Sequence, residues 1–330
     1  MPLKIGLVDV DSHNFPNLCL MKLSSYHKAL GGAVGWWKPD DYYDVVFASK
    51  VFSESKLPEI TNADQVILGG SGIDLNNKLP YEVEHSMPDY TLYPQYDFAL
   101  GFLTRGCPRL THAQSHGGFC ITPDKDGCVP RKVANLDEFW TGQKNVVLLD
   151  QNLLACKDRM ELIQQLADSK ATFEFNGGMD ARYMSDEVIN AFRSVKVKDF
   201  HFAWDDPREN MLPHFERIVK SGIKAPGQIG VYVLTNFWST TEEDLFRVYE
   251  LRKLGLMPYV MVYDKQKFVD EYGRWLPGVF DKYSEEQLIH FKTCQHMQRW
   301  TCFRRFIKSI PDFNDYEPYK KWRENGFRIR

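Results

Sequence analysis

The feature of this sequence that most constrains its fold is a regular alternation of apolar runs with amphipathic segments from about residue 95 onward. The apolar runs are "FALGFL", "NVVLLD", "ATFEFN", "DFHFAW", "IGVYVLT" and "PYVMVYD". Segments with helical periodicity stand between them, such as "KDRMELIQQLADSK" and "TEEDLFRVYELRKLG". Apolar runs that alternate with helical segments are typical of parallel β-strands joined by helices. Six such units predict a partial (β/α)6 barrel of the TIM-barrel type over residues 95–270.

The first 94 residues show the same alternation on a smaller scale. The apolar runs are "KIGLVDVD", "GAVGWW", "YDVVFAS" and "QVILGGSG", and "LMKLSSYHKAL" has the pattern of an amphipathic helix. Near-continuous apolar strands indicate a parallel sheet that is covered on both faces. We therefore expect an α/β chain in which a doubly wound parallel sheet over residues 1–94 precedes the barrel.

Residues 271–330 differ in character, because they are rich in aromatic and basic residues and have weak periodicity. The stretch "QRWTCFRRFIK" interleaves basic with aromatic residues: Arg299, Trp300, Phe303, Arg304, Arg305, Phe306 and Lys308. Such a pattern can hold phosphates and stack bases. The alternative is an extension that packs its aromatic side chains on the barrel and exposes its charges to water. We favour the second interpretation.

Composition bounds the class of protein. The chain has 330 residues, of which 43% are hydrophobic and 26% charged, as in ordinary globular proteins. Its net charge of -3 gives no global reason to expect nucleic acid or an anionic membrane as a partner. No apolar run approaches the roughly 20 residues of a membrane span, and the N-terminus has the pattern of a strand rather than a signal peptide. The seven scattered cysteines favour free or metal-bound thiols, so we expect a cytoplasmic protein.

The loop after the first predicted barrel strand is the strongest candidate site. "RGCPRLTHAQSHGGFC", residues 105–120, contains Cys107, His112, His116 and Cys120. In a β/α barrel the active site forms on the loops that follow the strands. Thiolates and imidazoles are the ligands of zinc and of iron–sulfur clusters. The sequence therefore predicts a metal site in this loop.

Three segments resemble the radical S-adenosylmethionine superfamily, in particular phage and prophage-type members related to its methylthiotransferase-like branch. They are "GFLTRGCPR" at 101–109, "FCITPDKDG" at 119–127 and "RKVANLDEFWTGQKNVVLLDQNLLACKD" at 131–158; "DFHFAWDDP" and "VYVLTNF" are also similar. The resemblance implies an enzyme in which a CxxxCxxC motif holds a 4Fe-4S cluster. The open iron of that cluster binds S-adenosylmethionine, whose reductive cleavage gives a deoxyadenosyl radical.

The resemblance also implies partners. A reductant protein such as a flavodoxin or ferredoxin would supply the electron, and the branch modifies RNA or protein. Nothing in the resemblance suggests a membrane partner.

The loop departs from the family pattern. Cys107 matches the first cysteine of the motif and Cys120 the last, but they are six residues too far apart, and Gly117 stands at the middle position. His116 or His112 would then be the third ligand, since histidine replaces cysteine on some iron–sulfur irons.

Two alternatives to a cluster remain open. The two cysteines and two histidines of the loop are the number and type of ligands that close a tetrahedral zinc site. The loop could equally be a flexible insertion that binds no metal. In either case the chain would be a catalytically degenerate barrel that serves as a binding or scaffold protein. Cys128 could join either metal site or remain an unliganded thiol.

Polar residues after the later strands are candidates for binding S-adenosylmethionine. Asp150 and Asn152 follow the second strand, where the family places a turn that receives the amino group of the cofactor; as an alternative they cap a helix. Asn176, Gly177 and Gly178 follow the third strand, and the two glycines allow a ligand to approach the backbone closely.

Arg182, shortly after these glycines, could pair with the carboxylate of the cofactor, and its alternative is an ordinary salt bridge in a loop. Asp205, after the fourth strand, and Asn236, after the fifth, would complete a polar rim suited to a ribose or a polar substrate.

The N-terminal sheet offers a partial match to cobalamin-binding domains. "DSHNFP" places His13 where the lower cobalt ligand stands in the DxHxxG motif, and "SKV" and "LGGSG" follow further on. Pro16 replaces the glycine of the motif, and Val51 ends the serine segment. A histidine after a strand is more often a surface residue, so we do not favour cobalamin as a cofactor.

Overall fold

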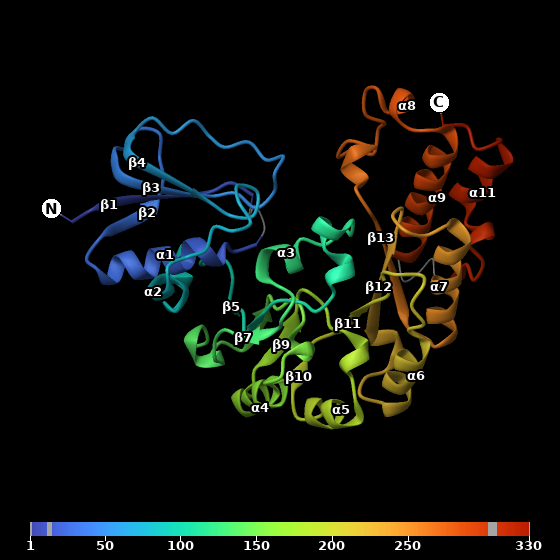
Figure 1. The fold of residues 1–330 in the computed structure, drawn as a ribbon, viewed down its shortest axis with the longest axis horizontal. Coiled ribbons are helices and arrows are strands. Elements are labelled where there is room, and N and C mark those ends of the chain that lie inside the picture. The colour runs from blue at the N-terminus through green and yellow to red at the C-terminus, as the bar shows by residue number, and fades with distance from the viewer. Residues whose placement is uncertain (1, 12–14, 303–308, 330) are drawn as a thin grey trace. The chain divides into compact units, whose positions relative to one another are not determined.

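The computed structural model describes residues 2–11, 15–302 and 309–329, and the chain folds into two compact units (Figure 1). Unit 1 comprises Met1–Gly177 and Ser194–Lys198, and unit 2 comprises Gly178–Arg193 and Asp199–Arg330. This division differs from the expected segments 1–94, 95–270 and 271–330, because the chain passes from one unit to the other inside the predicted barrel.

Unit 1 begins with a four-stranded parallel sheet in the order β2-β1-β3-β4. Its strands are β1 (Lys4–Asp9), β2 (Ala33–Trp36), β3 (Tyr43–Ser49) and β4 (Ala63–Gly69). Helix α1 (Leu18–Ala29) follows β1, and α2 (Tyr81–Glu84) follows β4. Figure 1 shows both helices on the same side of this sheet. The predicted parallel sheet is therefore confirmed.

The two faces of this sheet are covered differently. On one face Ile5 and Leu7 pack with Leu20 of α1. On the other face Val46 packs with Leu57 and Ile60, which belong to the irregular segment between β3 and β4. A doubly wound sheet needs helices on both faces, and within described residues 30–62 no helix joins β2 to β3 or β3 to β4.

The six predicted barrel strands all form, but they hydrogen-bond into two sheets. In unit 1 the parallel order is β10-β9-β8-β5, and in unit 2 it is β11-β12-β13. The six predicted strands are β5 (Phe98–Gly101), β8 (Asn145–Leu148), β9 (Thr172–Phe175), β11 (Phe200–Ala203), β12 (Ile229–Thr235) and β13 (Met257–Val262). The two-residue strand β10 (Lys196–Val197) was not predicted. The chain is thus an α/β protein with parallel sheets, as predicted.

Helices join these strands where the periodicity predicts them. They are α4 (Arg159–Ser169) in unit 1 and α5 (Asp186–Phe192), α6 (Leu212–Ser221) and α7 (Thr241–Lys253) in unit 2. Helix α7 begins with a capping box in which the Thr240 hydroxyl accepts from the Glu243 N–H and the Glu243 carboxylate accepts from the Thr240 N–H. Asp158 stands at the N-cap of α4 but makes no capping hydrogen bond.

Short elements fill the connections. Unit 1 contains an antiparallel pair, β6 (Thr104–Arg105) with β7 (Arg131–Lys132), and the one-turn helix α3 (Thr122–Asp126). The 3-10 turns are η1 (Tyr90–Leu92), η2 (Leu110–His112), η3 (Gln114–His116), η4 (Leu136–Glu138), η5 (Leu153–Ala155), η6 (Ala181–Tyr183), η7 (Pro226–Gln228), η8 (Lys265–Lys267) and η9 (Phe313–Asp315).

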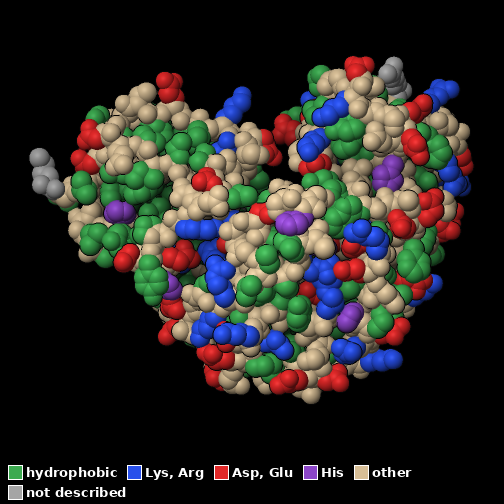
Figure 2. Space-filling model, in the orientation of Figure 1, with side chains coloured by type: hydrophobic (Ala, Val, Ile, Leu, Met, Phe, Trp, Pro, Cys, Tyr) green, Lys and Arg blue, Asp and Glu red, His purple; other side chains and the backbone are tan. Residues whose placement is uncertain are grey.

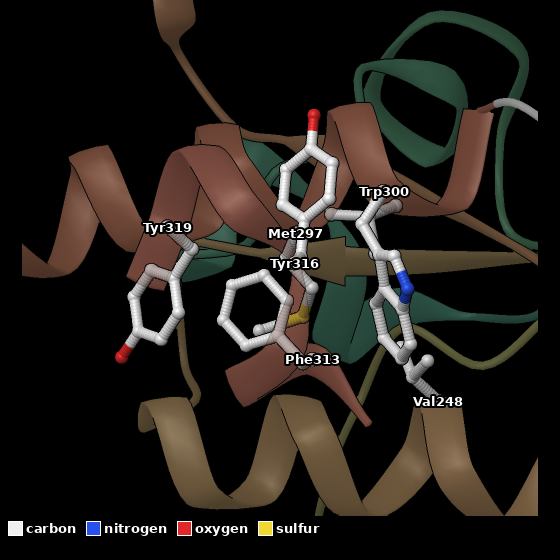
Figure 3. Packing of buried hydrophobic residues seen from close by; sticks show 7 residues of the cluster. Val248, Met297, Trp300, Phe313, Tyr316 and Tyr319 are labelled. Atoms are coloured by element: carbon white, nitrogen blue, oxygen red, sulfur yellow. The ribbon is translucent and has the colours of Figure 1, made fainter. Parts of the chain in front are cut away.

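The C-terminal segment folds as α8 (Val279–Lys282), α9 (Glu285–Cys302) and α11 (Glu317–Glu324). Its buried aromatic side chains pack together with Val248 of α7 and Val260 of β13, as Figure 3 shows for Trp300 and Phe313. Trp300 is fully buried, and its Nε1 donates to the Ile310 carbonyl at 3.0 Å. This packing fixes α9 on β13. Phe303, Arg304, Arg305, Phe306 and Lys308 lie outside the described residues.

Within the described residues no helix is both long enough and apolar enough to cross a membrane. Acidic and basic side chains are interspersed over the face drawn in Figure 2, where no large area carries one sign of charge. The visible surface therefore gives no indication of an extended phosphate-binding patch.

Candidate metal centre

The cysteine loop of unit 1 is closed at its base. Thr104 pairs with Lys132 and Arg105 with Arg131 in the β6–β7 ladder. Directly after this ladder the Cys107 N–H donates to the Gly127 carbonyl at 3.1 Å. Cys128 follows Gly127 in the sequence, so this hydrogen bond brings the backbone of Cys107 close to that of Cys128.

The insertion that separates Cys107 from Cys120 folds back on itself. The Cys120 N–H donates to the His112 carbonyl at 2.8 Å, and Ala113 and Cys120 form a β-bridge. A Cβ atom at Gly118 would lie 2.1 Å from the same carbonyl oxygen, so only glycine fits this close approach. Residues 113–119 thus form a closed excursion, and Cys120 is reached from Cys107 through residues 108–112. The closure offsets the extra length that separates this loop from the family motif.

Each of the two cysteine sulfurs accepts a hydrogen bond from a nitrogen. Asn152 Nδ2 lies 3.7 Å from Cys107 Sγ, and the Thr122 N–H donates to Cys120 Sγ at 3.4 Å. Both cysteines are half-buried. N–H donors beside a sulfur stabilise its thiolate form and tune a bound metal. The side chain of Asn152, for which we expected a contact with the cofactor or a helix cap, therefore lies beside the sulfur of Cys107.

The two histidines of the loop are held apart. Arg109 Nη2 lies 2.7 Å from Nε2 of the buried His112, and since a guanidinium only donates, this imidazole nitrogen accepts. His116 is exposed, and its Nδ1 lies 3.0 Å from Ser115 Oγ. Across the described residues, no group of three donors from this loop meets at the spacing of a single metal ion. The geometry does not support the tetrahedral zinc alternative.

Asp150 anchors the start of the loop. Its Oδ1 accepts from the Thr104 N–H at 2.6 Å and from Thr104 Oγ1 at 2.5 Å, and its Oδ2 accepts from the Leu103 N–H at 3.1 Å. Complete burial raises the pKa of this carboxyl group to about 6. The prediction that Asp150 contacts the cofactor or caps a helix does not describe this geometry, because both oxygens hold the loop after β5.

Asp126, at the end of α3, is a second anchor. Its carboxylate is buried, lies 3.7 Å from Arg105 Nη1 and 3.8 Å from Lys78 Nζ, and accepts from Gln151 Nε2 at 3.3 Å. The loop is therefore tied to β6, to the segment after β8 and to the segment that follows β4.

The loop after β9 has a structural explanation. Asn176 and Gly177 are exposed, and the Asn176 N–H donates to the Leu148 carbonyl at 2.9 Å. A Cβ at Gly177 would lie 2.5 Å from the Asp150 carbonyl oxygen, and Gly178, which begins unit 2, has a φ of +74°. Both glycines are thus required by the backbone without a ligand.

Arg182 in unit 2 is bound by carboxylates of the chain itself. Its Nε and Nη2 each lie 2.8 Å from an oxygen of Asp180, and its Nη1 lies 2.6 Å from Glu209 Oε2. The structure shows the salt-bridge alternative, and it does not favour Arg182 as the partner of a cofactor carboxylate. Asp205 is half-buried, and its main-chain oxygen accepts from Arg247 Nη1 at 3.1 Å.

Asn236 lies at a cavity at the carboxyl ends of β12 and β13 in unit 2. It has a left-handed φ of +62°, and its Nδ2 donates to the Tyr263 carbonyl at 3.0 Å. The cavity has a volume of about 690 Å³ and is also lined by Ser239, Thr241 and His290. His290 was missed by the sequence analysis. The one signal for it was its four-residue spacing from Cys294 within a helical segment.

The candidate cobalamin site follows β1, where the structure describes Asp11. His13 lies outside the described residues. Asp11 accepts hydrogen bonds from the Val51 and Phe52 N–H groups. Burial favours a higher pKa of its carboxyl group, but the Ser55 side chain and these two N–H groups outweigh burial and hold the pKa below the ordinary value. This carboxylate therefore orders the chain after β3.

A scan against models of known protein families finds no match, and a search of the curated proteins finds no similar protein.

Proposed function

We propose that this chain is a radical S-adenosylmethionine-type iron–sulfur enzyme whose cluster is held by Cys107, Cys120 and Cys128. The observation that carries the proposal is the closed excursion of residues 113–119, which removes the insertion from the path between Cys107 and Cys120. The bond from the Cys107 N–H to the Gly127 carbonyl supports the choice of Cys128 as the third ligand. His112 is less suitable because Arg109 donates to its Nε2, and His116 is less suitable because it lies within the closed excursion of residues 113–119.

The donor set fits an iron–sulfur cluster. Three thiols on one loop are the ligands of a four-iron cluster with one open iron. Two of the sulfurs are half-buried and Cys128 is exposed, so an incoming cluster can reach all three. With such a cluster bound, the open iron would hold the amino and carboxylate groups of S-adenosylmethionine and pass on the electron that cleaves it.

The chain's own residues supply support and orientation. Asn152 and the Thr122 N–H donate to two of the sulfurs and lower the cost of their negative charge. Asp150 and Asp126 hold the loop at both ends, so the thiols are presented from a fixed backbone. A flavodoxin-like or ferredoxin-like protein would be the source of the electron.

As part of the proposal, the strands β5, β8, β9, β11, β12 and β13 correspond to the six strands of the family's partial barrel. The strands follow one another along the chain in the order expected from the sequence, and each is parallel to its neighbours within its own sheet, which supports this correspondence.

The test is anaerobic reconstitution with iron and sulfide, followed by iron analysis and a deoxyadenosine assay with dithionite. We expect a brown protein with about four irons per chain that forms deoxyadenosine. C107S, C120S and C128S should each lose the colour and the product, whereas H112A and H116A should keep both. C302S is the matched control, since Cys302 is an exposed thiol in unit 2.

A colourless wild-type protein, or a brown C107S variant, would contradict the proposed function. A cluster that survives C128S but is lost in H112A or H116A would instead replace Cys128 by that histidine as third ligand. Wild-type protein that forms no deoxyadenosine and takes up no iron would favour the degenerate binding or scaffold protein.

A further inference from the structure

Three potential metal ligands converge inside unit 2, far along the chain from the cysteine loop. Asp244 lies on α7, and His290 and Cys294 lie on α9. Asp244 and Cys294 are fully buried, while His290 is half-buried. A carboxylate, an imidazole and a thiol are the three kinds of side chain that zinc binds.

The distances between these donor atoms fit one metal ion. Cys294 Sγ lies 3.6 Å from His290 Nε2 and 3.7 Å from an oxygen of Asp244, and all three donors lie within 4.8 Å of one another. Zinc binds sulfur at about 2.3 Å and nitrogen or oxygen at about 2.0–2.1 Å, so tetrahedral angles place a sulfur about 3.5 Å from its neighbouring ligands. The side chains already stand near these separations.

His290 and Asp244 each have a second polar atom that does not face Cys294, and a neighbouring side chain contacts each of these atoms. Thr241 Oγ1 lies 3.0 Å from His290 Nδ1, which leaves Nε2 directed toward Cys294. Arg247 Nη2 donates to Asp244 Oδ1 at 2.5 Å, which leaves Oδ2 directed toward Cys294. Histidine and carboxylate ligands of metals characteristically have such second hydrogen bonds, because these fix the ligand's orientation.

The donors are carried by rigid elements. Residues four apart lie on the same face of a helix, so α9 presents His290 and Cys294 together. The buried cluster around Met297 and Trp300 holds α9 against β13 and α7 (Figure 3). Metal ligands on packed helices keep their geometry without a bound ion.

Space for a fourth ligand lies beside the three donors. His290 and Thr241 line the cavity of about 690 Å³ at the ends of β12 and β13, whereas Asp244 and Cys294 are buried and are not among its lining residues. A metal with three protein ligands and an adjacent cavity has the form of an open rather than a closed site. The full burial of Cys294 also excludes it as a nucleophile for a substrate in this cavity.

We propose that Asp244, His290 and Cys294 bind a divalent transition-metal ion of the zinc class, whose fourth ligand is water or a small polar molecule from the cavity. The inference does not depend on the iron–sulfur proposal, because that loop belongs to unit 1.

The test uses cobalt(II) as a spectroscopic probe on the full-length chain after removal of metal with a chelator. We expect one cobalt ion with the visible bands of tetrahedral coordination and a sulfur-to-cobalt charge-transfer band. In a C107S/C120S background, where the cysteine loop offers no pair of thiols, C294S should lose the charge-transfer band. C302S should keep it, since Cys302 is an exposed thiol on the same helix. The C107S/C120S double variant should also keep it, which separates this site from the cysteine loop.

Two further variants guard against a misfolded C294S protein. H290Q changes a half-buried side chain and should abolish the rise in Tm that zinc gives to the wild type. T241V removes the hydroxyl beside His290 Nδ1 and should weaken cobalt binding by about 10–100-fold. A charge-transfer band that persists in C294S when Cys107 and Cys120 are also replaced, or an equal zinc-dependent rise in Tm in H290Q, would overturn the proposal. So would a chelator-treated wild type that binds no cobalt.

Discussion

The two clusters of potential metal ligands differ in what holds them. In unit 1 the cysteines stand on irregular backbone within one short stretch of sequence, and their sulfurs are half-buried or exposed. In unit 2 the donors come from two packed helices, and Asp244 and Cys294 are fully buried. A loop of the first kind gains its final geometry when the metal binds, whereas helices of the second kind provide it beforehand. A search for potential ligands that lie close together in the sequence therefore identifies the cysteine loop of unit 1 and misses the donor set of unit 2.

We expect the largest effect on the packed donor set of unit 2 from replacing Arg247, whose side chain is fully buried. Arg247 donates to Asp244 and to the carbonyls of Trp204 and Leu234. R247M would leave the Asp244 carboxylate buried without its partner, so we expect a loss of about 3–5 kcal/mol in the free energy of unfolding. Chemical denaturation measures this loss. R274M is the control, since Arg274 is exposed and its partner Asp270 is not buried, and it should cost less than about 1 kcal/mol. Similar losses in the two variants would contradict a preorganised polar core.

Acid should weaken unit 2 through His296. Burial lowers the pKa of this histidine to about 4, and among the described residues neither ring nitrogen has a hydrogen-bond partner. Because the unfolded chain takes up the proton near pH 6.5, stability is lost as the pH falls from about 6.5 to about 4. The loss should amount to about 3 kcal/mol. Hydrogen exchange of peptides from α9 measures it. H296L should remove this pH dependence, and an unchanged slope in that variant would assign it to other groups.

Acid should have the opposite effect on the cysteine loop through Asp150. The pKa of this carboxyl group is raised by burial to about 6, so the folded chain holds a proton that the unfolded chain has lost above about pH 4. Stability is therefore present below pH 4 and decreases as the pH rises from about 4 to about 6, by up to about 3 kcal/mol. Hydrogen exchange at Leu103 and Thr104 should follow this slope. D150N should lack it, and a slope that persists in D150N would remove Asp150 as its source.

Much of the fold could be predicted because its signals are local. Apolar runs predicted the strands β5, β8, β9, β11, β12 and β13, and the helical periodicity of "TEEDLFRVYELRKLG" predicted α7. The division of these strands between two sheets was not predictable, since it depends on which strand edges meet. The irregular segment that covers one face of the first sheet was also not predicted. Apolar residues in a loop can bury a strand as a helix does, so the apolar pattern of the strands does not show which of the two covers them.

The candidate site was predicted in part. The loop with Cys107 and Cys120 was identified, but the role of Asp150 was not, because its partners Leu103 and Thr104 lie more than forty residues earlier. Arg182 shows the limit of residue type as a guide. A guanidinium can bind the carboxylate of a cofactor, but in this chain Arg182 binds the carboxylate of Asp180, which is only two residues away. The set of Asp244, His290 and Cys294 required knowledge of how α7 and α9 pack.

The closed excursion of residues 113–119 also bears on how this loop can change in evolution. It leaves and rejoins the chain beside the same residue, His112, so its length does not alter the position of Cys120. We therefore expect insertions and deletions between Gln114 and Gly117 to leave the positions of Cys107 and Cys120 unchanged. The same four exposed residues form a natural attachment point for an affinity tag or a fluorescent label.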